Sequence, residues 1–205
     1  MANRKGFARK GHVFINVPFD PQFELQYIAI ITGLVTLGFI PHSTLEVPAT
    51  TDRLHRIFDL IRSCEFSIHD LSRVQMSATR PRCPRFNMPF EAGLALSVNF
   101  AGIRHECAFF EAQRHRLEKS LSDLNGYDPY IHHGHVKGVL RALSDLFESS
   151  LGKVDAADLF RLYRIVSRDA FIIKKRNGDD LFRPSSFRQL VYESQHRARD
   201  LGYIP

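Results

Sequence analysis

Glu91 is the residue whose surroundings in the sequence point most directly to chemistry. It lies near the start of a predicted helix, and Leu94, Ala95 and Val98 follow it at the spacing of one helical face. We therefore expect its carboxylate to point inward, where an unpaired charge is costly. The positive end of the helix dipole would help it stay ionised, and such a carboxylate can attack or stabilise an electron-poor carbon. The alternative is a first-turn acid that only interacts with the dipole.

Two other polar residues lie in or at the end of apolar runs. Asp70 ends the run 65–71 and either serves a ligand or caps the following loop together with Ser72. Asn16, within Phe-Ile-Asn-Val, needs hydrogen-bond partners if its strand is buried. Gly93, beside Glu91, is predicted to let its helix pack closely on a sheet, either for packing alone or to serve a site.

Metal, cofactor and nucleotide-hydrolysis motifs are not found in the sequence. His132, His133 and His135 have no acidic or cysteine partner at a known metal-binding spacing, so we expect a surface loop there. The acidic residues of 122–129 do not match a calcium loop and are read as turn chemistry. GxGxxG, Walker, GxSxG and HExxH patterns do not occur. No metal and no cofactor are expected.

The overall composition is that of a globular protein kept in a reducing compartment. Three cysteines, odd in number and far apart, predict free thiols and a cytoplasmic location. No apolar run is long enough to span a membrane, and no signal peptide is expected. The net charge of +6 divides unevenly, with +4 in residues 1–10, +4 in 153–205 and −2 between. The basic ends are read mainly as solvated tails and helix faces.

The elements that must position these residues alternate along the chain. Apolar runs ended by turn residues predict strands at 12–17, 39–41, 65–71 and 107–111. Helical periodicity predicts helices at 22–37, from 52, from 87 to about 99, and 136–150, with further helices near 155–170 and 185–200. This alternation predicts an α/β fold with a doubly wound parallel sheet, whose ligands bind beyond the carboxyl ends of the strands. Asp52 is predicted to cap the second helix.

We divide the chain into three parts. Residues 1–11 form a basic N-terminal arm, 12–152 the α/β domain and 153–205 a C-terminal helical extension. In the extension, Leu159, Leu162, Tyr163 and Val166 share one helical face that must cover something apolar. A homo-oligomer is expected to form through this stripe, and the alternative is a monomer whose tail packs on its own core.

Three segments together resemble the nucleoside 2-deoxyribosyltransferase family, and the TIR domains that cleave NAD are similar in plan. The segments are Val13-Phe-Ile-Asn-Val-Pro-Phe-Asp20, Ile68-His-Asp-Leu-Ser72 and Asn87-Met-Pro-Phe-Glu-Ala-Gly-Leu-Ala95. The resemblance covers about 12–112 and implies a flavodoxin-like sheet. It implies that Glu91 attacks or stabilises the anomeric carbon and that Asp70 holds ribose hydroxyls or assists the leaving base. The substrate-binding residues that it implies are Phe14, Asn16, Phe19, Asp20, Ser72, Asn87 and Met88.

The resemblance implies cleavage or transfer of an N-glycosidic bond. Where the family usually has an acidic residue shortly before the catalytic Glu, this chain has Asn87. The basic loop 72–85 favours a phosphorylated ligand, NAD or another nucleotide. By analogy, the chain would be a bacterial antiphage effector. Two alternatives stay open: a nucleotide-sensing module on the same fold that binds without reacting, and a scaffold or nucleic-acid-associated protein that uses its basic ends.

Overall fold

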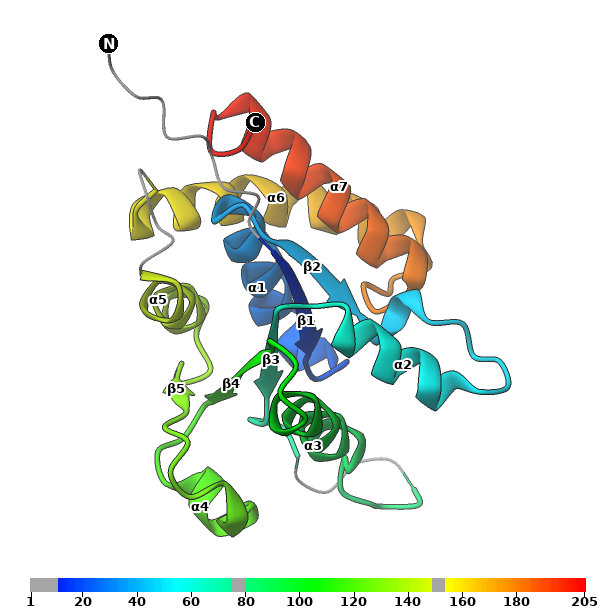
Figure 1. Ribbon diagram of the computed structural model, residues 1–205. Helices are drawn as coiled ribbons and strands as arrows, with labels where there is room; N and C mark the ends of the chain where they lie inside the picture. Colours follow the sequence, from blue (N-terminus) through cyan, green and yellow to red (C-terminus); the bar gives the residue numbers. More distant parts are fainter. Residues whose placement is uncertain (1–10, 75–79, 149–153) are drawn as a thin grey trace.

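A parallel sheet in the order β2-β1-β3-β4-β5 forms the centre of the protein (Figure 1). The computed structural model describes residues 11–74, 80–148 and 154–205. In them, the strands are β1 His12–Asn16, β2 Ile40–Ser43, β3 Phe66–Asp70, β4 Glu106–Glu111 and β5 Tyr130–Ile131. β1 pairs with both β2 and β3, so the strand order reverses there. This is the predicted α/β, flavodoxin-like arrangement, with a ligand crevice expected beyond the ends of β1 and β3.

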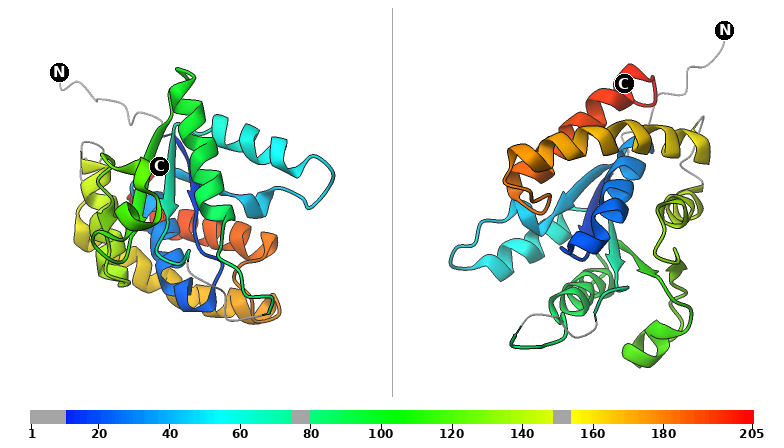
Figure 2. Two further views of the ribbon diagram at one scale, coloured as in Figure 1. Left: turned by 90° about the horizontal axis from the view of Figure 1, so that it is seen from below. Right: turned by 180° about the vertical axis from the view of Figure 1, so that it is seen from behind.

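Helices cover both faces of the sheet. Those of the described residues are α1 Glu24–Thr36, α2 Arg53–Arg62, α3 Asn87–Phe100, α4 Arg116–Ser120, α5 Val136–Leu146, α6 Ala156–Arg176 and α7 Pro184–Asp200. Helices α2 and α3 lie on one face and α1 and α5 on the other, while α6 and α7 pack on α1 (Figures 1 and 2). In the described ranges, no helix combines the length and the apolar character needed to cross a membrane.

The alternation of side chains along β1 divides the core between the two faces. Val13 and Ile15 pack in the large cluster that contains α1, whereas Phe14 packs in a second cluster with residues of α2 and α3. All three side chains are fully buried. Successive residues of a strand point to opposite faces, so a strand covered on both sides is apolar at every position. This explains the continuous apolar run in the sequence.

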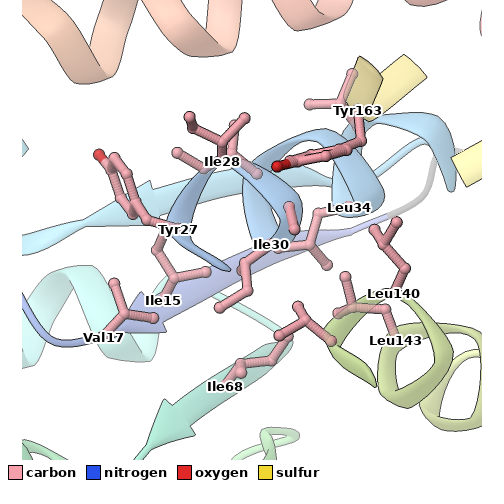
Figure 3. Packing of buried hydrophobic residues seen from close by; sticks show 14 of the residues in the cluster. Ile15, Val17, Tyr27, Ile28, Ile30, Leu34, Ile68, Leu140, Leu143 and Tyr163 are labelled. Atoms are coloured by element: carbon pink, nitrogen blue, oxygen red, sulfur yellow. The ribbon is translucent and has the colours of Figure 1, made fainter. Parts of the chain in front are cut away.

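Helix α1 is enclosed on two sides. Every residue from Tyr27 to Thr36 is buried, because the sheet and α5 lie on one side of the helix and α6 and α7 on the other (Figure 3). A Cβ on Gly33 would lie 2.5 Å from a methyl carbon of Leu143, so glycine allows α1 and α5 to approach closely. The hydroxyl of Thr32 donates to the Ile28 carbonyl at 2.8 Å, which satisfies a polar group inside this layer.

The apolar stripe of the C-terminal extension covers α1 of the same chain. Leu159, Leu162 and Val166 are fully buried, and Tyr163 is 9% exposed. Figure 3 shows Tyr163 beside α1. The apolar face that suggested an oligomer is therefore covered by the chain's own core. This agrees with the alternative interpretation, in which the tail packs on its own core. The homo-oligomer itself stays a prediction. The basic N-terminal segment, residues 1–10, lies outside the described residues.

Several local predictions are wrong. Asp52 precedes α2, but it has a left-handed φ of 69° and its side chain caps nothing in the helix; it contacts His55 instead. Gly93 is exposed, and a Cβ there would meet nothing within 4 Å, so it serves no close packing.

The short strand β5 and helix α4 were not predicted, because two and five residues are too few to show a period. Helix α5 ends at Leu146; the last two residues predicted for it, 149 and 150, lie outside the described ranges.

Candidate active site

A cleft of about 810 Å³ opens beyond the carboxyl end of β1, between α2 and the start of α3. Five of the nine residues proposed from the sequence line it. They are Asn16, Phe19, Asn87, Met88 and Glu91. The loop before α3 supplies further walls through Cys83 to Phe86, and α2 contributes Arg53, Leu54 and Ile57. The cleft therefore joins two of the three sequence segments that carry the predicted site.

Glu91 is the carboxylate of this cleft. Burial raises the pKa of its side chain to about 7, and the positive charge of Arg53 opposes this shift in part. Ala95 and Val98, one turn or two further along α3, are buried as predicted, so the carboxylate lies on the inner side of the helix. A carboxyl group with a pKa near neutrality can exchange a proton with a ligand or act as an anion at slightly higher pH.

Asn16 connects the end of β1 to the first turn of α3. Its Nδ2 donates to the Met88 carbonyl at 2.7 Å and lies 3.0 Å from the Nδ1 of His69 on β3. Asn16 is 4% exposed, so the expectation that a buried amide has partners is confirmed. Because Met88 is three residues before Glu91 on the same helix, this contact fixes where the carboxylate stands relative to the sheet.

The contact continues as a chain of buried hydrogen bonds. His69 Nε2 lies 2.9 Å from the Ser67 hydroxyl, which lies 2.9 Å from His105 Nε2. His105 Nδ1 lies 2.8 Å from the Cys64 carbonyl. A carbonyl only accepts, so His105 carries its proton on Nδ1 and accepts the Ser67 proton on Nε2. Ser67 then accepts from His69 Nε2, and His69 Nδ1 accepts from Asn16.

The two histidines of this hydrogen-bond network, His69 and His105, are neutral in the folded protein. Burial and, to a smaller extent, the neighbouring His105 lower the pKa of His69 to about 3. Burial also lowers the pKa of His105, although its bond to the Cys64 carbonyl opposes this. The proton order derived above needs one proton on each ring, which agrees with these shifts. From the sequence, His69 is one of the polar groups at the end of the third predicted strand, but it was not among the predicted site residues.

Asp20 anchors the loop before α3, which forms one wall of the cleft, through hydrogen bonds to Arg73 and Arg85. Its carboxylate accepts hydrogen bonds from Arg73 Nε at 2.9 Å and from Arg85 at 2.7 Å, and from the Gln22 amide at 2.8 Å. Burial favours the neutral acid, but these donors outweigh it and the pKa of Asp20 lies below its usual value. Asp20 does not line the cleft. It positions Arg85, which does.

Asp70 and Ser72 lie away from the cleft. Asp70 is fully buried, and its Oδ1 accepts from the backbone N–H of Ser72 at 3.0 Å and from the Ser72 hydroxyl, as the capping alternative predicted. Its Oδ2 lies 3.0 Å from His132 Nε2. His132 Nδ1 accepts from the Gly134 amide, which leaves the ring proton on Nε2, but Nε2 and Asp70 Oδ2 are not aligned for a hydrogen bond. His132 is 1% exposed, so placing it in a surface loop was wrong.

Phe14, the remaining residue of the predicted set, is fully buried and does not line the cleft. Arg53 was not predicted from the sequence; it lines the cleft, and its guanidinium group donates to the carbonyls of Thr44 and Val47. No sequence motif marks Arg53; its place directly after Asp52 at the start of α2 was the only hint.

In the described ranges, no group of three or more His, Cys, Asp or Glu side chains could hold a metal ion.

The cleft has an apolar rim that faces solvent. Its exposed large side chains are Phe19 (40%), Leu54 (51%), Phe86 (66%) and Phe90 (53%). Phe86 and Phe90 are four residues apart around the start of α3 and so lie on the same side of it. Exposed apolar side chains that gather around a cleft mark a binding surface. Flat aromatic ligands, such as the bases of nucleotides, stack on such rings.

Comparisons with protein-family models, with curated proteins and with solved structures gave no match for this chain. The chemistry of the cleft therefore has to be argued from its residues. It combines one carboxylate of raised pKa, the guanidinium group of Arg53, which acts on that carboxylate without a direct ion pair in the described residues, a neutral amide held in place, and an aromatic rim.

Proposed function

We propose that this protein cleaves or transfers an N-glycosidic bond of a nucleotide or of NAD, with Glu91 as the catalytic carboxylate. The observation that carries the proposal is that Glu91 lies inside a cleft of about 810 Å³, on a helix fixed to the sheet through Asn16. The resemblance in the three sequence segments supports it. A role as a bacterial antiphage effector rests on that resemblance alone.

The reaction requires positive charge to be stabilised at the anomeric carbon. When the bond between C1′ and the base nitrogen breaks, its electron pair leaves with the base and the sugar becomes oxocarbenium-like. The ionised carboxylate of Glu91 either stabilises this charge or forms a bond to C1′, and water or a second acceptor completes hydrolysis or transfer. The pKa of about 7 means that this ionised form is well populated only above neutrality.

The cationic side of the cleft supports a phosphorylated ligand. Arg53 donates to two backbone carbonyls and forms no ion pair with a carboxylate of the described residues, although its positive charge acts on Glu91. Arg85 is held by Asp20, which it shares with Arg73, and this leaves two cations against one anion. Arginine groups bind phosphate oxygens well because their planar fork matches them. The base would stack on the rim formed by Phe86 and Phe90.

A second candidate function is a nucleotide-sensing module that binds without reacting. The observation in its favour is the place of Asp70, which contacts Ser72 and His132 and does not line the cleft. Glu91 then has no second carboxylate beside it to assist the leaving base. In this alternative the cleft residues recognise the ligand, and the signal passes to another part of the protein.

Incubation of the purified protein with NAD, with nucleotides and with 2′-deoxynucleosides, followed by chromatography of the released base, tests the proposal. We expect release of free base by the wild type and a loss of orders of magnitude in the Glu91→Gln variant, which keeps the shape and removes the charge. Glu106→Gln is the matched control, since Glu106 is exposed at the start of β4. Binding of a nucleotide without base release supports the sensing module, and turnover retained in a folded Glu91→Gln variant contradicts the role of Glu91.

A further inference from the structure

The outer face of α6 carries a row of arginines. Arg161, Arg164 and Arg168 are three and four residues apart, so they project from the same side of the helix, and all three are exposed. The inner side of α6 packs on α1 through the stripe that begins at Leu159. Figure 2 (right) shows α6 lying across α1 on the outside of this layer. The arginine row therefore faces away from the core.

No carboxylate of the described residues forms an ion pair with these three arginines. The two acidic residues within α6 have other partners. Asp158 caps the helix start with Asp155 and accepts from the Tyr203 hydroxyl at 2.9 Å, and Asp169 accepts from Arg197 at 3.1 Å. Arg161 also lies beside the Tyr203 hydroxyl. The positive charge of the row is thus not neutralised by its own helix.

A fourth cation and a shallow hollow belong to the same surface. The hollow has a volume of about 410 Å³ and is lined by the three arginines with Ala157, Phe160 and Ile165. Lys137, exposed on α5, holds its ammonium group 5.8 Å from the centre of the Phe160 ring. Four cations from two helices therefore lie on one surface that also holds a half-buried aromatic ring.

We propose that this α6 surface, made of Lys137, Arg161, Arg164 and Arg168, binds the phosphate backbone of a nucleic acid. Arg161 and Arg168 are separated by about 10 Å along the helix at 1.5 Å per residue, which is the axial length of about three phosphates of one strand. Side chains of this kind position a protein on nucleic acid without reading its sequence. The proposal does not depend on the function assigned to the cleft, which lies on the opposite side of the sheet.

The arginine half of the α6 surface is charged and lacks the exposed apolar side chains that would insert into a lipid layer. The large exposed apolar residues of α6 are Phe171 (63%) and Ile172 (49%), which follow the arginine row toward the end of the helix. Among the arginines, Phe160 and Ile165 are only half-exposed and offer nothing to insert. A membrane-bound helix needs apolar side chains that enter the headgroup region beside its cations. The arginine half of α6 therefore matches a polyanion in water.

Binding of labelled DNA and RNA oligonucleotides by the full chain, measured by fluorescence anisotropy over a salt series, tests this. We compare the wild type with the variant Arg161→Gln, Arg164→Gln, Arg168→Gln. The matched control is Arg56→Gln, Arg62→Gln, Arg104→Gln, which removes the same charge from exposed positions in α2 and in the turn between α3 and β4. Duplex and single-stranded oligonucleotides of both kinds show which nucleic acid is preferred.

We expect the wild type and the control to bind with a steep salt dependence. The α6 variant should bind at least tenfold more weakly, and its log–log salt slope should be smaller by about 2.7 for duplex DNA or about 2 for single strands. Equal losses in the two triple variants overturn the proposal, as does absence of binding by the wild type at about 50 mM salt. Binding to phosphatidylserine vesicles without binding to nucleic acid overturns it in favour of a lipid surface. If the triple variant does not fold by circular dichroism, Arg164→Gln alone must show a slope change near one third as large.

Discussion

Asn16 Nδ2 lies 2.7 Å from the carbonyl oxygen of Met88 and joins the end of β1 to the first turn of the helix that carries Glu91. The same amide nitrogen lies 3.0 Å from His69 Nδ1, so both of its protons have acceptors. The amide therefore cannot turn over without losing one of these bonds. The position of Glu91 in the cleft depends on a residue that does not touch the carboxylate itself.

The variant Asn16→Leu should impair both stability and the cleft. Leucine has the same number and branching of side-chain heavy atoms as asparagine but leaves the Met88 carbonyl and His69 Nδ1 buried without a donor. We expect a loss of about 2–4 kcal/mol in the free energy of unfolding, measured by urea denaturation. The folded fraction should also lose affinity or turnover for the nucleotide. Unchanged stability in Asn16→Leu would mean that the amide contributes no net hydrogen bonding.

The pH dependence of base release reports the role of Glu91. Its pKa of about 7 in the empty cleft is higher than that of an ordinary Glu, because burial disfavours the ionised form. If the ionised carboxylate acts at C1′, kcat/KM should rise as the pH increases through about 7 and level off above it. A profile that instead falls through the same pH would assign Glu91 the role of an acid that protonates the leaving base.

Arg85 should distinguish phosphorylated from unphosphorylated ligands. The variant Arg85→Gln removes one cation from the wall of the cleft, and we expect weaker binding of nucleotides and of NAD by about tenfold. Hydrogen bonds to charged groups contribute about 1.5–3 kcal/mol each, which sets this scale. Binding of the corresponding nucleosides, measured by calorimetry, should change little. An equal loss for nucleotide and nucleoside would show that Arg85 supports the loop and does not hold phosphate.

Asp70→Asn should destabilise the protein without changing the chemistry of the cleft. The Asp70 carboxylate accepts from Ser72, and its other oxygen lies 3.0 Å from His132 Nε2; an amide replaces one of these acceptors with a donor. We expect a lower melting temperature in a thermal scan and an unchanged kcat for the folded fraction. A large fall in kcat at unchanged stability would return Asp70 to the active site.

The neutral histidines should make the fold sensitive to acid. The pKa of folded His69 is about 3, below the unfolded value of about 6.5. The unfolded chain therefore takes up a proton that the folded protein does not accept, and stability falls as the pH drops from about 6.5. The loss is about 1.4 kcal/mol per pH unit for this residue. In His69→Gln the slope of unfolding free energy against pH should decrease by one proton; an unchanged slope would contradict a neutral His69.

Local patterns in the sequence were enough to predict the repeated strand–helix units, and with them the parallel sheet. They also predicted that Asn16 needs partners and gave a cap with Ser72 as one of the two interpretations of Asp70, because both inferences depend on burial and on neighbours close in the chain. The first turn of α3, with Pro89 where no N–H is needed, was likewise local. Short elements such as β5 carry too few residues for a pattern.

Only the tertiary structure decided which polar residues meet. Along β3, Ile68 packs in the cluster with α1, so Asp70, two residues on, faces the same side and meets His132. His69 faces the other side, where Asn16 and the helix of Glu91 lie. Successive residues of a strand point to opposite faces. Asp70 and Glu91 therefore lie on different sides of the sheet, although both are near the carboxyl ends of the strands. Which helix covers which face is set by long-range packing, and the separate segments of the sequence do not contain it.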